Sequence, residues 1–158
     1  MMPLLLSLPA QQPSPVTQLA VKRLVTFFEG LSCQSLSQLD AFYTENAWFK
    51  NPLNDVRGAR QIRRVFNPMY AAMHEPRFVV TDSSIESNQC LVTWEFEFYF
   101  NRLDKTSAQK IRGVSHIQFT AVGLVDFQRD YWDTAQESYT KLPSVGGLVR
   151  WLKKWVKW

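Results

Sequence analysis

Val92-Thr93-Trp94-Glu95-Phe96-Glu97-Phe98-Tyr99-Phe100 is the stretch of sequence that decides the fold. Its even-numbered residues are all apolar, whereas its odd-numbered residues are Thr, Glu, Glu and Tyr. A period of two is typical of a β-strand with one buried and one polar face. The residues on either side continue the pattern. We therefore expect strands at about 77–86, 90–101, 109–120 and 124–133, joined by short turns and hence antiparallel.

The first half of the chain has a helical period instead. Apolar residues recur from Leu19 to Leu31, which predicts a helix that begins near Ser14-Pro15. A short helix at 35–43, a strand at 47–51 and a helix from about residue 59 follow. Pro68 should break or kink that last helix, and the alternative is that Met69 to Met73 continue it as another turn. A short helix at 133–142 and a final helix at 148–158 complete the order. The predicted fold class is α+β, a cone of N-terminal helices packed on a strongly curved antiparallel sheet, with a C-terminal amphipathic helix.

The length of 158 residues suits one domain. We interpret residues 1–15 as a flexible lead-in, 16–142 as the domain and 143–158 as a basic, Trp-rich C-terminal helix. Cys33 and Cys90 fit neither a disulfide scaffold nor a zinc pattern, which predicts buried or half-buried thiols in a reducing compartment. Because no stretch reads as a secretory signal or a membrane span, the expected location is cytoplasmic. With two histidines in the chain, no metal site and no cofactor are expected.

The net charge of +4 comes from the tail, where five basic residues and no acidic residue follow from Lys141 onward. Since a nucleic-acid footprint needs a basic face on the fold itself, no nucleic-acid partner is expected. In residues 148–158, Trp151, Trp155 and Trp158 share one helical face and basic residues occupy the rest. This composition is typical of a helix at a membrane surface. The alternative interpretation is that the tryptophans dock on the domain or on a dimer mate.

Period-two parity places polar residues of three neighbouring strands on one face. Glu97, His116 and Asp130 are the expected catalytic residues there. Burial of Asp130 in an apolar cavity would move its pKa toward a useful acid/base range, and His116 would orient it or polarise a carbonyl oxygen. Glu97 would be a second acid/base group or only a pairing partner. The alternative is a simply solvated face on which arginines pair with these carboxylates.

The opposite parity set is apolar and predicts a homodimer. If the helices cover the polar face, this set needs a second subunit to shield it from water. The competing interpretation is that the set faces the helices as core. Its members are Phe96, Phe98, Ile117, Phe119, Phe127 and Tyr131.

Two segments resemble the nuclear-transport-factor-two-like superfamily, and within it the SnoaL-like polyketide cyclases. They are Phe42-Tyr43-Thr44-Glu45-Asn46-Ala47-Trp48-Phe49-Lys50-Asn51-Pro52 and Gln128-Arg129-Asp130-Tyr131-Trp132-Asp133. The resemblance covers about residues 16–142. It implies the α+β fold, an aspartate acid/base at Asp130 and a histidine on the preceding strand at His116.

A more distant similarity to limonene-epoxide hydrolase implies substrate-binding places at Phe49 and Asn51, with the family's tyrosine hydroxyl absent at Phe49. That family's arginine is missing near Glu95 and Glu97. Ketosteroid isomerase carries its base where this chain has Asn51, and an amide does not abstract a proton at neutral pH. Glu95, Gln118 and Trp132 complete the expected substrate-binding residues.

The expected function is cofactor-independent acid/base chemistry, of isomerase, cyclase or hydrolase type, on a hydrophobic small molecule that bears a carbonyl group. The alternative is a non-catalytic ligand-binding or assembly domain. Because this fold hosts both kinds of protein, the site has to decide between them.

Overall fold

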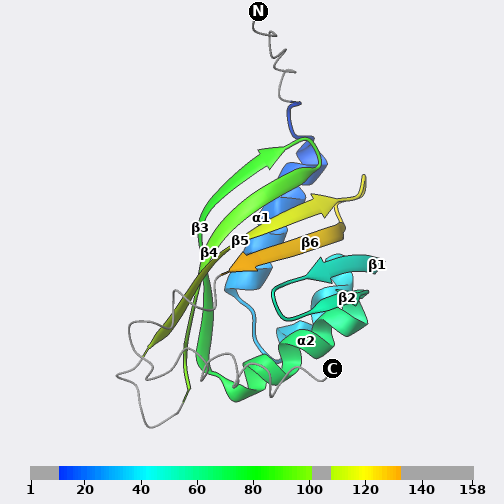
Figure 1. The fold of residues 1–158 in the computed structure, drawn as a ribbon. Coiled ribbons are helices and arrows are strands. Elements are labelled where there is room, and N and C mark those ends of the chain that lie inside the picture. Colours follow the sequence, from blue (N-terminus) through cyan, green and yellow to red (C-terminus); the bar gives the residue numbers. More distant parts are fainter. Residues whose placement is uncertain (1–10, 101–107, 133–158) are drawn as a thin grey trace, which may run out of the picture.

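The computed structural model describes residues 11–100 and 108–132 (Figure 1). The predicted helices at 133–142 and 148–158, and most of the lead-in, lie outside these residues. The described elements, in chain order, are α1 (Pro15–Glu29), the 3₁₀ helix η1 (Ser35–Ala41), β1 (Tyr43–Lys50), β2 (Asp55–Arg57), α2 (Ala59–Ala72), β3 (His74–Glu86), β4 (Gln89–Tyr99), β5 (Gln109–Phe119) and β6 (Val125–Trp132).

The helices form where the sequence predicts them, with two differences. Ser14 caps α1, its Oγ accepting a hydrogen bond from the Thr17 N–H at 3.1 Å, and Pro15 occupies the first turn. The short helix predicted at 35–43 is a 3₁₀ helix over Ser35–Ala41. At Pro68, where a break or a kink is predicted, the helix does not break, because α2 continues through it to Ala72. α2 buries a row of apolar side chains, so packing outweighs the hydrogen bond that proline removes.

The six strands form one sheet in the order β2-β1-β6-β5-β4-β3. The prediction of an antiparallel sheet holds for every pair except β1 and β6, which run parallel. The sheet is therefore mixed. This pairing joins the first strand to the last, and it depends on contacts between distant parts of the chain rather than on a turn.

The face of the sheet toward the helices, called the inner face here, holds the core. In β4 the even-numbered residues are buried on it, and β5 adds Ile111, Ile117 and Phe119. Phe96, Phe98, Ile117 and Phe119 thus face the helices, as the competing interpretation of the apolar set holds. The argument that a second subunit must cover them is wrong, while the homodimer itself stays a prediction.

A β-bulge reverses the side-chain alternation of β6. Phe119 pairs with Val125 and Gln118 pairs with Phe127, so Asp126 is an extra residue on β6. Beyond the bulge the even-numbered residues turn to the inner face, where Gln128 is buried, and the odd-numbered Tyr131 is 45% exposed on the opposite, outer face. The prediction that Phe127 and Tyr131 share a face with Ile117 and Phe119 is therefore wrong.

The two cysteines differ in burial. Cys90 is buried, as predicted, and burial raises the pKa of its thiol to about 12. Cys33 is exposed, contrary to the prediction. None of the helices within 11–100 and 108–132 has the length and apolar character to cross a bilayer.

Candidate functional site

Asp130 lies on the inner face near the end of β6, held by two side chains. The Ser115 hydroxyl donates to Asp130 Oδ1 at 2.6 Å, and Gln128 Nε2 donates to the same oxygen at 2.9 Å. Within the described part of the chain, no hydrogen bond reaches the other oxygen, Oδ2. One oxygen is thus fixed and the other is left for a ligand.

Ser115 and Gln128, which bind Asp130, are themselves positioned by hydrogen bonds from Trp94 and Tyr43. Trp94 Nε1 donates to the Ser115 hydroxyl at 2.9 Å, which leaves the hydroxyl proton for Asp130. The Tyr43 hydroxyl donates to Gln128 Oε1 at 2.6 Å, which turns the amide N–H toward the carboxylate. Burial raises the pKa of Tyr43 well above its ordinary value, and the nearby charge of Asp130 raises it further, so Tyr43 stays a donor. The network extends from β1 through β6 and β5 to β4.

The surroundings of Asp130 raise the pKa of its carboxyl group. Burial raises the pKa of its carboxyl to about 6, against the hydrogen bonds from Ser115 and Gln128, which lower it. Near neutral pH the group exists in both protonation states. This is the condition for giving and taking a proton.

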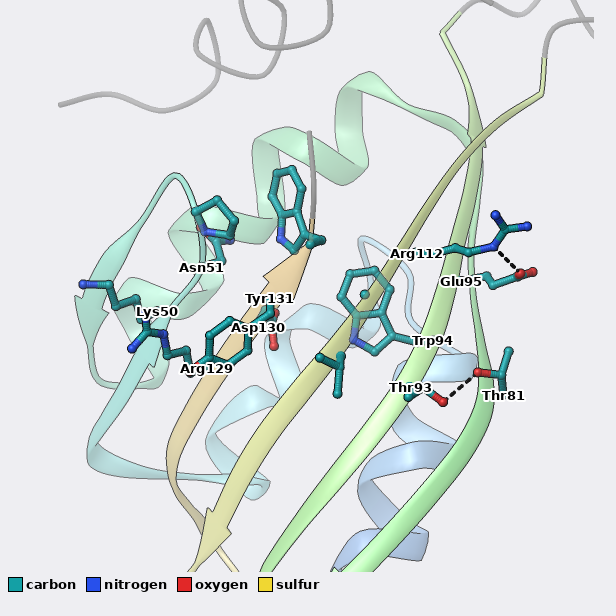
Figure 2. Close-up of a pocket in the computed structure, with 14 residues that line it drawn as sticks. Lys50, Asn51, Thr81, Thr93, Trp94, Glu95, Arg112, Arg129, Asp130 and Tyr131 are labelled. Atoms are coloured by element: carbon teal, nitrogen blue, oxygen red, sulfur yellow. Dashed lines mark hydrogen bonds and ion pairs between the residues drawn. The ribbon is translucent and has the colours of Figure 1, made fainter. Parts of the chain in front are cut away.

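Asp130 borders at least three hollows among the described residues. The first, called the inner cavity here, lies beneath α2 and has a volume of about 60 Å³; Phe66, Met69, Phe96 and Trp132 are among its walls. A second cavity of about 30 Å³ lies toward α1. The third is the outer groove, a wider hollow of about 760 Å³ that includes residues of the outer face. Figure 2 shows the outer groove, with Lys50, Arg129 and Tyr131 on one side of Asp130 and Trp94 on the other.

The structure does not bring the three predicted catalytic residues together. His116 pairs with Arg129 across β5 and β6 and contacts Gln89 at 2.8 Å through Nε2, on the outer face. Glu97 also lies on the outer face, bound to Arg77 at 2.9 Å and to Lys110 at 3.1 Å. The expectation that both share a face with Asp130 is wrong, because the bulge in β6 turns Asp130 to the inner face while His116 and Glu97 stay on the outer face.

An ion-pair row on the outer face accounts for the two glutamates. Lys110 bridges Glu95 at 2.9 Å and Glu97 at 3.1 Å, and Arg112 binds Glu95 at 3.0 Å. The hydrogen bonds from Lys110 are the largest cause that lowers the pKa of each glutamate. Glu97 is therefore held ionised as a pairing partner, the second of the two roles expected for it.

The predicted substrate-binding residues divide into two groups. Asn51, Glu95 and Trp132 line the outer groove, and Asn51 and Trp132 also line the inner cavity. Phe49 is wholly buried and packs edge-to-face on Phe66 at 5.5 Å between ring centroids. Gln118 lies on β5 opposite Phe127, away from Asp130.

The side-chain amide of Asn51 is oriented by hydrogen bonds within its own loop. Its Oδ1 accepts the backbone N–H groups of Leu53 at 2.9 Å and Asn54 at 2.7 Å, and the Asn54 side-chain amide at 3.1 Å. Within the described residues, the Asn51 amide N–H₂ has no acceptor. Its donors remain for a group in the adjoining hollows.

Sequence reasoning missed four of the five members of the Asp130 network. Ser115 could have been predicted from the sequence. It is odd-numbered like Ile111 and Ile117, so it is a polar residue on the apolar face of its strand. Trp94, Tyr43 and Gln128 give no such signal, since their partners lie on other strands. Among the described residues, no three His, Cys, Asp or Glu side chains gather in a cluster that would hold a metal ion.

Comparisons with solved structures place the fold among known proteins. A protein from Jannaschia sp. CCS1 assigned as a SnoaL-like polyketide cyclase is 15% identical, with a TM-score of 0.65 over 78% of this chain and 91% of that one. An epoxide hydrolase of the limonene-epoxide-hydrolase-like type from M. tuberculosis is 13% identical, with a TM-score of 0.61 over 85% and 90%. A steroid delta-isomerase from Pseudomonas aeruginosa is 12% identical, with a TM-score of 0.60 over 92% and 94%. At these identities the likeness shows the fold.

The family comparison is direct. The model of the SnoaL-like domain matches residues 24–126, about two thirds of the chain, which include β1 to β5 and only the first two residues of β6, so that Asp130 lies beyond the match. No curated protein matches the chain. Together with the three described helices packed on a six-stranded mixed sheet, the match identifies this chain as a member of the SnoaL-like domain family.

Proposed function

We propose that this chain catalyses proton transfer on a hydrophobic, carbonyl-bearing small molecule, without a cofactor, and that Asp130 is the acid/base group. The observation that carries the proposal is the asymmetry of its carboxylate. Ser115 and Gln128 hold Oδ1 at 2.6 and 2.9 Å, whereas Oδ2 has no partner in the described chain. A base fixed in this way keeps one basic oxygen aimed at a bound substrate.

The chemical step is the removal of a proton from the carbon next to a carbonyl group. Oδ2 of Asp130 takes the proton, the C–H electron pair forms the C=C bond of an enolate, and the carbonyl π pair moves to oxygen. An N–H of Asn51 donates to that oxygen as its charge develops. Return of the proton to the same carbon gives exchange, and its return to another atom gives isomerisation. In a cyclase, the enolate carbon instead attacks a second carbonyl carbon of the substrate, the π pair of that carbonyl moves to its oxygen, and the alkoxide takes the proton from Asp130.

The aromatic and aliphatic walls of the inner cavity favour an apolar substrate. Phe66, Met69, Phe96 and Ile111 offer no hydrogen bond. Polar groups come from the remaining lining residues, among them Asp130, Asn51, Asn54 and Trp132. The pKa of about 6 supports a base at pH 7 and an acid below pH 6. His116 and Glu97 take no part in this proposal.

Hydrogen–deuterium exchange tests the proposal. The full chain is incubated in deuterated buffer at pH 7 with cyclohexanone or 2-tetralone, and loss of the α-proton signal is followed by NMR. We expect exchange above the buffer rate, and a loss of at least about 100-fold of that excess in Asp130→Asn.

The matched control is Asp126→Asn, which alters an exposed carboxylate of the same strand and should leave the rate unchanged. Equal exchange in wild type and Asp130→Asn would contradict the proposal. Binding of these ketones without exchange would favour the alternative, a non-catalytic ligand-binding domain.

A further inference from the structure

The outer groove and the inner cavity have four lining residues in common. Asn51, Trp94, Asp130 and Trp132 line both hollows, at the place where β1 ends at Lys50 and β6 ends at Trp132. The inner cavity, at about 60 Å³, holds only a small part of a ligand, whereas the groove, at about 760 Å³, has the size of a small-molecule site. A ligand whose reacting end meets Asp130 thus lies mostly in the groove.

Among the described residues, three cationic side chains line the groove, and two of them form ion pairs with a carboxylate. Lys50 binds Asp55 at 3.1 Å, and Arg112 binds Glu95 at 3.0 Å. The guanidinium of Arg129 instead lies over the ring of Tyr131, 4.7 Å from its centroid. Among the residues that the structure describes, Arg129 has no acidic partner.

The position of Arg129 fits a ligand that also reaches Asp130. Arg129 precedes Asp130 on β6 and pairs in register with Lys50 of β1, so two cations meet at this end of the groove. Glu95 lies on β4, on the far side of β5 from β6. An anionic group is attracted to the Arg129 end and repelled by Glu95 and by ionised Asp130.

We infer that the ligand is an amphiphilic carboxylic acid, whose carboxylate binds Arg129 in the outer groove while its apolar body passes Trp94 and Trp132 toward Asp130. The planar guanidinium, stacked on Tyr131, presents paired N–H donors that match the two oxygens of a carboxylate. That the other end of the ligand carries a reacting carbonyl group depends on the function proposed above. Recognition of the carboxylate needs no proton transfer.

A pair of probes that differ only in charge tests the inference. 2-Naphthylacetic acid and 2-naphthylacetamide have the same apolar ring and nearly the same shape. Each is titrated into the full chain at pH 7.5, and the indole N–H signals of Trp94 and Trp132 are followed by NMR. We expect both signals to move, and the acid to bind at least about fivefold more tightly than the amide.

The variants locate the charge that is responsible. In Arg129→Gln the preference for the acid should vanish while the affinity for the amide stays the same, and Arg129→Met should repeat the result. Arg112→Gln, a second arginine of the same groove, should keep the preference. The inference is overturned if neither probe moves the two indole signals, if the amide binds as tightly as the acid, or if the preference survives both Arg129 variants. Because no turnover is measured, failure of Asp130→Asn to slow exchange would refute the proposed chemistry and leave this result standing.

Discussion

Two carboxylates of this sheet illustrate how position decides chemistry at the scale of the residue. Asp130 faces the core, and its burial outweighs two hydrogen bonds and raises its pKa to about 6. Glu97 faces outward, and its hydrogen bond to Lys110 is the largest of the influences that lower its pKa. Only the first is suited to exchange a proton near neutral pH.

The raised pKa of Asp130 predicts a pH-dependent cost to stability. Because the folded pKa of about 6 exceeds the ordinary value of 3.8, the folded state binds the proton more tightly than the unfolded state. The contribution to stability is complete below pH 3.8 and is lost as the pH rises through 6. At pH 7.5 we expect Asp130→Asn to raise the free energy of unfolding by about 1–3 kcal/mol, and at pH 3.5 by almost nothing.

Urea denaturation at a series of pH values measures this difference. Asp126→Asn is the control, and we expect a change of less than about 0.5 kcal/mol at each pH because that side chain is exposed. An Asp130→Asn variant that is no more stable than wild type at pH 7.5 would show that burial does not disfavour the charge.

At the scale of the element, β5 and β6 are shaped by contacts with their neighbours. The bulge at Asp126 sets which face Asp130 occupies, and the Thr120–Leu124 turn precedes it directly. Across the sheet, Trp94 of β4 lies over Gly113 of β5 and reaches Ser115 with its indole N–H. A glycine is needed there because the indole occupies the place of its side chain.

Gly113→Ala should therefore displace Trp94, which binds Ser115 next to Asp130. The new Cβ would overlap the indole ring of Trp94 and would lie 2.8 Å from the carbonyl oxygen of Tyr131. We expect a loss of about 1–3 kcal/mol in the free energy of unfolding and a displaced Trp94, visible as a change in tryptophan fluorescence. Gly30→Ala is the control, since its Cβ would meet nothing closer than 3.4 Å. Equal stability of both variants would disprove this account of Gly113.

At the scale of the molecule, the helices cover the inner face and leave the outer face to polar and partly exposed residues. The large apolar residues exposed on this outer face are Leu91 at 50% and Tyr131 at 45%, among those described. Scattered exposure of this kind is normal for a monomer. Burial of the core residues therefore does not require a second subunit.

The homodimer predicted from the sequence can still be measured directly. Light scattering at micromolar concentration should give a mass of about twice 18.4 kDa if the prediction holds. A mass of 18.4 kDa over that range would contradict it. Truncation at residue 147 serves as a second sample, because it separates dimerisation through the domain from dimerisation through residues 148–158.

The sequence by itself determined the class of fold and, among the described elements, all except β2. Alternation in 92–100 is a local signal, since each side chain's face follows from its own position, and it predicted β4 and its buried even-numbered residues correctly. The capped start of α1 is local in the same sense. Asp130 was singled out by a resemblance of its segment, which also needs no knowledge of its neighbours.

Only the tertiary structure decided what surrounds Asp130. One extra residue in β6 inverts every later side chain, and a bulge arises from pairing with β5 rather than from the composition of β6. The parallel pairing of β1 with β6 brings Tyr43 to Gln128, 85 residues away. These contacts join segments that are distant in the sequence, and neither segment contains a local pattern that predicts the other. For this reason the sequence grouped His116 and Glu97 with Asp130 and did not indicate Ser115 or Gln128.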